Sequence, residues 1–153
     1  MSRVESRLAE LGLSLPAAAA PAGSYVPVVR AGSLAFTSGQ LPMAGGVLQN
    51  PGKVGAEVSP EEGYRLAQTC TLNALAALKQ ALGSLDRIVR VVKVVGFVSS
   101  APGFQAQPKV INGASDLLVA VFGEAGQHAR SAVGVAELPL GSAVELELIV
   151  EVE

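Results

Sequence analysis

The stretch "SPEEGYRLAQTCTLNALAALKQALGSLDRIVRVVKVVGFVSS", residues 59–100, contains the helix and the strand that decide the fold. Ser59 is a favourable N-cap, Pro60 suits the first helical position and Gly83 suits the end of the last turn, so a helix is predicted between them. Residues 87–100 are β-branched over most of their length and predict the strongest strand of the chain. The chain therefore combines a long helix with a sheet.

The predicted helix carries a stripe of small side chains, which lets a helix lie close against a sheet. The stripe consists of Ala67, Cys70, Ala74, Ala77 and Ala81. Cys70 is the only cysteine, so no internal disulfide can form. Its place on the stripe predicts a buried and inert core thiol.

Turn residues and apolar spacing divide the rest of the chain into further elements. We expect helices over residues 3–12 and 109–122, and strands over residues 25–30, 34–37, 131–138 and 143–152, the last two joined as a hairpin through "PLGS". After the N-terminal helix the order is β-β-α-β-α-β-β, which predicts a two-layer α+β domain. Residues 1–153 are expected to form a single domain, in which residues 1–22 are an additional N-terminal helix and linker.

The alternation of side chains in the last strand predicts how the sheet is covered. Its apolar set, expected beneath the helices, is Val144, Leu146, Leu148, Val150 and Val152. Its other set, expected on the helix-free face, is Glu145, Glu147, Ile149, Glu151 and Glu153. We place the small residues that share a side with Arg130 on the helix-free face as well, namely Ala132, Gly134 and Ala136. Such small side chains leave room for a ligand or for another subunit.

Composition disfavours several classes of protein. The formal net charge is −2, the pI is about 5.4 and Lys and Arg do not cluster, whereas nucleic-acid surfaces need clustered cations for their phosphate contacts. One cysteine and one histidine cannot build a Cys/His zinc site, and the carboxylates lack the spacing of a calcium loop, so we expect no metal. No apolar run approaches the roughly 20 residues of a membrane span, and the N-terminus lacks a secretory pattern. These features favour a cytoplasmic protein with no membrane or nucleic-acid partner.

Two charged side chains are the main candidates for chemistry. Arg130 begins the small, apolar strand in "HARSAVGVAELPLG", residues 128–141. It is either a solvated strand end or a guanidinium aimed at an anion, because its planar fork pairs bidentately with a carboxylate. Glu145 is either one more solvated residue of the acidic face or a carboxylate that exchanges protons with a bound ligand. The single histidine, His128, has no partner motif and is expected in a surface loop.

Three segments resemble the Rid (YjgF-like) family of reactive-intermediate deaminases, over about residues 23–152. They are "SYVPVVRAGSLAFTSGQLP", "GFVSSAPGF" and "ARSAVGVAELPLGSAVELELIV", and the first and last are specific when they occur together. The resemblance implies a chorismate-mutase-like fold and a homotrimer with sites in the clefts between subunits. It also implies hydrolysis of imines and enamines of 2-amino acids to 2-keto acids and ammonia, without a metal or organic cofactor.

The resemblance assigns residues to the site by position. Arg130 aligns with the arginine that binds the substrate carboxylate, and Glu145 aligns with the glutamate of the site. Tyr25 aligns with a tyrosine near the cleft entrance. Ser38 and Gly39 align with residues that approach the ligand with hydroxyl and backbone groups. On the residues alone, a single tyrosine at a strand start such as Tyr25 is more often structural, and Ser38 with Gly39 is a turn at the end of a strand.

The chain departs from the family pattern at three places, one of which is the additional N-terminal helix. Ala132 stands where cysteine or threonine is usual, and the segment between Val98 and Asn112 is longer. An imine deaminase is therefore one hypothesis, and a non-catalytic trimer that binds a small carboxylate, such as a 2-keto acid, is the alternative. An endoribonuclease, a name often given to the family, is disfavoured by the acidic pI, the lack of a basic patch and the lone histidine.

Overall fold

A computed structural model describes residues 1–20 and 23–153, so Pro21 and Ala22 of the expected linker lie outside the described residues. The helices are α1 (Arg3–Glu10), α2 (Pro60–Leu82) and α3 (Gln107–Phe122). The strands are β1 (Val28–Ala31), β2 (Leu34–Thr37), β3 (Met43–Ala44), β4 (Val47–Leu48), β5 (Ile88–Ser99), β6 (Ala129–Val135) and β7 (Val144–Val152). The two short strands β3 and β4 lie in a glycine-rich segment that shows no strand pattern in the sequence.

The bounds of α2 agree with the sequence prediction, because the residues at its two ends satisfy backbone groups that a helix leaves without partners. The Oγ of Ser59 accepts a hydrogen bond from the backbone N–H of Glu62 at 3.1 Å. At the other end, Gly83 has a φ of 86°, a conformation that favours glycine, and its N–H donates to the carbonyl of Lys79 at 2.8 Å.

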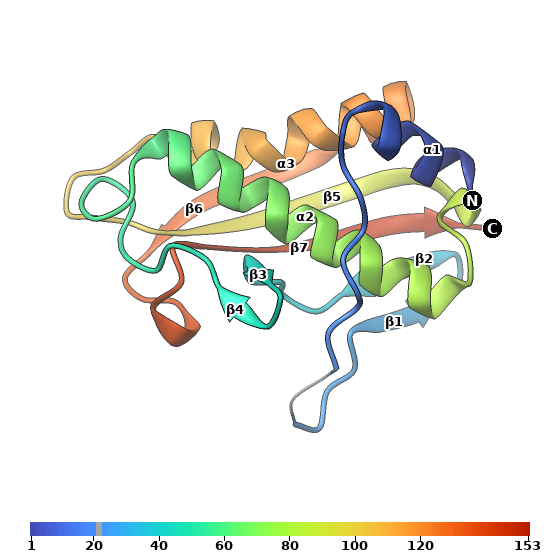
Figure 1. The fold of residues 1–153 in the computed structure, drawn as a ribbon, viewed down its shortest axis with the longest axis horizontal. Helices are drawn as coiled ribbons and strands as arrows, with labels where there is room; N and C mark the ends of the chain where they lie inside the picture. The colour runs from blue at the N-terminus through green and yellow to red at the C-terminus, as the bar shows by residue number, and fades with distance from the viewer. Residues whose placement is uncertain (21–22) are drawn as a thin grey trace.

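Five strands form one mixed sheet in the order β1-β2-β7-β5-β6. All neighbours in it are antiparallel except β5 and β6, which are parallel and are connected by α3. Helices α2 and α3 lie over the same face of the sheet (Figure 1). The two-layer α+β prediction is therefore confirmed. Across the described ranges, 1–20 and 23–153, no helix has the length and apolar character needed to cross a membrane.

The core lies between the sheet and these two helices. The five apolar residues of β7 that the alternation assigns to the helix side are all buried, with at most 3% of each exposed. Cys70 of α2 is fully buried in the same core, which confirms its predicted place, and burial raises the pKa of its thiol well above the usual value. The helices approach closely at Gly113, where a Cβ would overlap the backbone carbonyl of Tyr64.

The hairpin predicted between the last two strands is wrong. β6 pairs only with β5, and β7 pairs with β5 and β2, so β5 separates them. The connection from β6 to β7 contains a short 3₁₀ turn, Pro139–Gly141, in which Leu140 has a φ of 60°. The whole connection is long enough to pass over the end of β5. Consecutive strands are neighbours in most sheets, and this pair is an exception to that tendency.

The face predicted for Arg130 and its small neighbours is also wrong. A Cβ at Gly134 would meet the side chains of Gln107 and Ser100, and Gln107 begins α3. Ala132 packs against the core. Arg130 and these small residues therefore lie on the helix side of β6, whereas Ala136 lies beyond the end of the strand. Ile149 and the glutamates of β7 alternate with the buried set and lie on the helix-free face, as expected.

Candidate functional site

Four of the five expected site residues line one cavity of about 230 Å³. These are Tyr25, Ser38, Gly39 and Glu145. The rest of the lining comes from the chain before β1, the segment after β2, helix α2 and the turn before β7, and consists of Ala19, Ala20, Pro27, Gln40, Leu41, Met43, Ala77 and Pro139. Residues distant in the sequence thus meet where the segment after β2 runs beside the start of β7, at the bridge between Gln40 and Leu146, and Figure 1 shows β2 and β7 in the sheet.

Backbone hydrogen bonds fix the segment after β2 against its neighbours. The N–H of Ser38 donates to the carbonyl of Pro27 at 2.8 Å, and its hydroxyl donates to the carbonyl of Val26 at 2.6 Å. Gln40 and Leu146 exchange two backbone hydrogen bonds, at 2.7 and 3.1 Å. Ser38 therefore holds the chain that carries the tyrosine, while the next residues are attached to β7. The hydroxyl oxygen of Ser38 remains able to accept a further hydrogen bond.

Glu145 lies directly against the backbone of Gly39. A Cβ at Gly39 would lie only 2.5 Å from Oε2 of Glu145 and 3.0 Å from its Cδ. Glycine is needed at this position because of that close approach. Partial burial raises the pKa of the Glu145 carboxyl, and the neighbouring charge of Glu147 raises it further. A carboxyl with a raised pKa is a better proton acceptor and donor near neutral pH.

Arg130 lies elsewhere, held by α3. Its Nη1 donates to Oδ1 of Asn112 at 2.7 Å and to Oγ of Ser115 at 3.1 Å. Among residues 1–20 and 23–153, the Nε and Nη2 of Arg130 find no hydrogen-bond acceptor, so the edge of the guanidinium that carries them is free of protein partners from these residues. That edge has the geometry that pairs with a carboxylate.

Ser115 is not among the site residues predicted from the sequence. The available signal is spacing: Asn112 and Ser115 are three residues apart, so both project from the same side of α3. The pattern does not show that Arg130 lies opposite that side, since this depends on how β6 packs.

A single chain does not bring Arg130 and Glu145 together. On β5, Val94 is in register with Arg130 of β6, and Phe97 is in register with Glu145 of β7. Positions that differ by an odd number along a strand point to opposite faces. The guanidinium therefore lies on the helix side at the sheet edge, and the carboxylate lies on the other face, two strands away.

Other groups lie outside this arrangement. The Nδ1 of His128 lies 3.0 Å from the carbonyl of Ala129, and burial lowers the pKa of this histidine, with the charge of Arg130 acting in the same direction. A larger cavity, of about 530 Å³, lies between α1, the chain that follows it and α2, and its described lining includes none of the expected site residues. Among the residues that the structure describes, no three His, Cys, Asp or Glu side chains form a group that could hold a metal ion.

Comparison with known proteins places this geometry in a family. A sequence profile described as "YjgF/chorismate_mutase-like, putative endoribonuclease" matches residues 5–152. The chain is 50% identical to Protein TCP17 of Trypanosoma cruzi, over 97% of this chain and 94% of that protein. It is 47% identical to Atu1372 of Agrobacterium tumefaciens, a solved structure of unknown function, with a TM-score of 0.93 over 99% of this chain and 93% of that one. It is 29% identical to RidA from an Antarctic Psychrobacter, with a TM-score of 0.62 over 88% and 94% of the two chains.

Proposed function

The chain belongs to the YjgF/chorismate mutase-like family, and we propose that it is a homotrimeric deaminase that hydrolyses imines and enamines of 2-amino acids to 2-keto acids and ammonia. The observation that carries this proposal is the division of the site into two complementary parts. One part is the guanidinium edge of Arg130, which fits a carboxylate. The other is a small cavity with Tyr25, Ser38 and Glu145, which fits the reacting carbon and a water molecule.

A cyclic trimer would bring the two parts together. The helix-free face of the sheet exposes Val29, Phe36 and Val133, at 52%, 36% and 44% of their surfaces. These exposed apolar side chains, on a face that also carries the glutamates of β7, support contact with further copies of the chain. In a closed ring each copy presents β6 to the next copy in the same way, so the Arg130 of one subunit can serve the cavity of its neighbour.

The proposed reaction uses only water and groups of the chain. Arg130 binds the substrate carboxylate, and Asn112 and Ser115 hold the guanidinium in position. Water adds to the C=N carbon of the protonated imine, which an enamine reaches by protonation at carbon, so that a C–O bond forms and the π electrons move to nitrogen. Glu145 accepts a proton from the water and returns it to the amine, which becomes an ammonium group. The C–N bond then breaks and ammonia leaves with the electron pair, while the hydroxyl proton passes to the Glu145 carboxylate as the new C=O bond forms.

The deciding experiment replaces Arg130. An amino-acid oxidase generates the imine in situ, and keto-acid formation gives kcat/KM for wild type, Arg130→Ala and Arg130→Lys. Removing the charged hydrogen bonds should cost roughly 2–4 kcal/mol of transition-state binding, or about a 30- to 1,000-fold loss. Arg130→Lys should rescue poorly because an ammonium cannot reproduce the two-point fork. If Arg130→Ala melts and works like wild type, the guanidinium binds no substrate carboxylate and the proposal is rejected.

The alternative is a trimer that binds a small carboxylate without turnover. Ala132, beside Arg130 where the family usually has cysteine or threonine, is the observation that favours it. Binding of a 2-keto acid that depends on Arg130, with no acceleration of imine hydrolysis, would support this alternative and reject the deaminase. An endoribonuclease is disfavoured by the net charge of −2, and cleavage of a labelled RNA by the purified protein would contradict our proposal.

A further inference from the structure

Residues 1–20, here called the N-terminal segment, cross the surface of the molecule and end at the candidate site. The chain leaves α1, passes over α2 and descends toward β1 (Figure 1). At the end of the segment, Ala19 and Ala20 line the cavity that contains Tyr25 and Glu145. Residues far from Glu145 in the sequence thus form part of the wall of the site.

The beginning of the segment is attached to the body of the protein by hydrogen bonds. The carboxylate of Asp86 accepts the backbone N–H groups of Arg3 and Val4, at 3.0 and 3.2 Å. The Nε of Arg7 donates to the carbonyl of Ala120 at 2.9 Å. These bonds join α1 to the turn before β5 and to α3.

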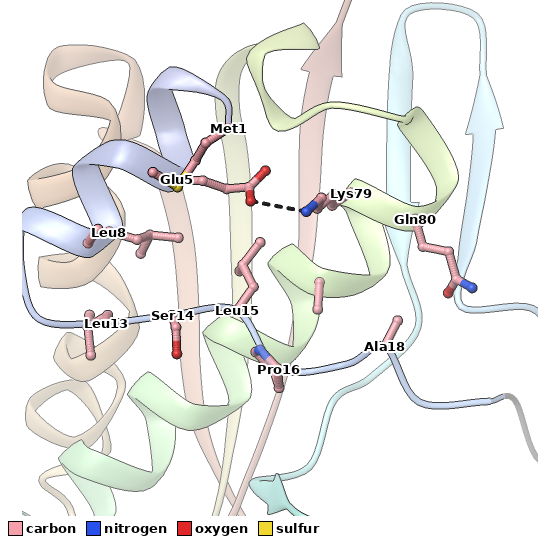
Figure 2. A pocket seen from close by; sticks show the side chains of 12 residues that line it. Met1, Glu5, Leu8, Leu13, Ser14, Leu15, Pro16, Ala18, Lys79 and Gln80 are labelled. Carbon is pink, nitrogen blue, oxygen red and sulfur yellow. Dashed lines mark hydrogen bonds and ion pairs between the residues drawn. The ribbon is translucent and has the colours of Figure 1, made fainter.

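The middle of the segment is attached to α2. Leu8 is 1% exposed, and Leu13 and Leu15 pack against the core. Figure 2 shows Lys79 of α2 pointing toward Glu5 of α1, with 3.0 Å between Nζ and Oε2. The N-terminal segment is therefore held by α2, by α3 and by the turn before β5, and its last residues reach the cavity from these attachments.

The lining of the cavity contains both polar and apolar side chains. The polar side chains are those of Tyr25, Ser38, Gln40 and Glu145. The apolar lining residues are Ala19, Ala20, Pro27, Leu41, Met43, Ala77 and Pro139. The volume of about 230 Å³ is below the range of roughly 300–1,000 Å³ that holds drug-sized ligands, so the cavity fits a small molecule. In so small a cavity, a substrate bound with its reacting carbon near Glu145 has its side chain close to the apolar lining.

We propose that the N-terminal segment sets the size of the substrate side chain. Ala19 and Ala20 belong to the apolar lining and limit the space for a substrate side chain, so that the site takes imino acids with short aliphatic side chains and discriminates against branched, long and aromatic ones. The inference rests on the proposed deaminase function and identifies the wall that determines its substrate range. Each additional methylene group of the substrate side chain has to displace Ala19 and Ala20 or remain in water.

The test introduces larger side chains at Ala20 and Ala19, which reduces the space in the cavity, and measures how the preference among substrates changes. Ala20→Leu is compared with wild type on imines generated in situ from alanine, 2-aminobutyrate, leucine and phenylalanine. Wild type should prefer the first two. In Ala20→Leu, kcat/KM for the 2-aminobutyrate imine should fall about 10-fold or more relative to the alanine imine, because a methylene in an apolar pocket is worth about that factor. Ala19→Val is a second, smaller reduction of the same space and should shift the preference in the same direction.

Ala17→Leu is the matched control, since Ala17 is exposed, lies in the same segment and is absent from the described lining of both cavities around the segment. It should keep the wild-type preference. All three substitutions are at exposed positions and should leave the melting temperature close to that of wild type. The inference is overturned if Ala20→Leu and Ala19→Val treat all four imines as wild type does, or if Ala17→Leu changes the preference equally.

A binding measurement separates this inference from the proposed reaction. Pyruvate, 2-oxobutanoate and 4-methyl-2-oxopentanoate are titrated into wild type and Ala20→Leu, with ligand NMR as the readout. If the variant loses affinity in order of side-chain size while wild type hydrolyses no imine, the wall is supported and the deaminase is rejected. If wild type hydrolyses imines and neither turnover nor binding in the variant depends on side-chain size, the deaminase stands and the wall is rejected.

Discussion

A subunit-mixing experiment tests whether Arg130 and Glu145 act in one site although they lie on opposite faces of a single chain. Arg130→Ala keeps Glu145, and Glu145→Gln keeps Arg130, so each variant alone should be inactive. In a trimer that contains both variants, one of the three clefts combines an intact arginine with an intact glutamate from its neighbour. Random assembly of equal amounts makes about three quarters of the trimers mixed, so activity should recover to roughly one quarter of the wild-type value.

The assay uses equal amounts of the two variants that are unfolded together, refolded and isolated as trimers without selection for mixed species, with keto-acid formation as the readout. Trimers that were assembled separately and then mixed serve as the control and should remain inactive. Wild type mixed in the same way with the double variant Arg130→Ala/Glu145→Gln should show about one quarter of the activity of wild type at the same total protein concentration, whereas a site within one chain would give about one half. Failure of the two single variants to complement each other would refute the reasoning.

Four further outcomes follow from the geometry. Gly39→Ala should lower kcat about 10- to 100-fold with a nearly unchanged melting temperature, because the new Cβ displaces the Glu145 carboxylate; wild-type kinetics would contradict this. Ser115→Ala should raise KM roughly 3- to 10-fold with little change in kcat, and Ser115→Thr should restore it, because this hydroxyl positions Arg130 rather than reacting; a fall in kcat alone would contradict a positioning role. The backbone N–H groups of Arg3 and then Val4 lower the pKa of Asp86, so its contribution to stability is present above its unfolded pKa of about 3.9 and is lost as the pH falls through the folded value. Asp86→Asn should therefore lower the melting temperature at pH 7, and the difference should shrink below about pH 4; an equal difference at both pH values would contradict this. Dialysis against EDTA should leave the deaminase rate unchanged, and a loss that one divalent ion restores would show that a metal is needed.

Local patterns in the sequence predicted what depends on neighbouring residues. The two ends of α2 follow from Ser59, Pro60 and Gly83, since caps and φ preferences act within a few residues. The alternation of β7 predicted its buried face, because the period of a strand is two whatever its neighbours are. The resemblance to the Rid family named four residues that meet in one cavity, and their catalytic roles stay predictions.

The tertiary structure decided everything that depends on which elements become neighbours. The period of two indicates that Arg130 and Ala132 share a face of β6, but it does not indicate which face. That choice was made when β6 paired in parallel with the free edge of β5 and turned Arg130 toward Asn112 and Ser115. Likewise, nothing local in the alanine-rich chain before β1 places it beside Glu145. Pairing and packing between distant segments depend on the total surface that they bury together, and short-range preferences do not contain that information.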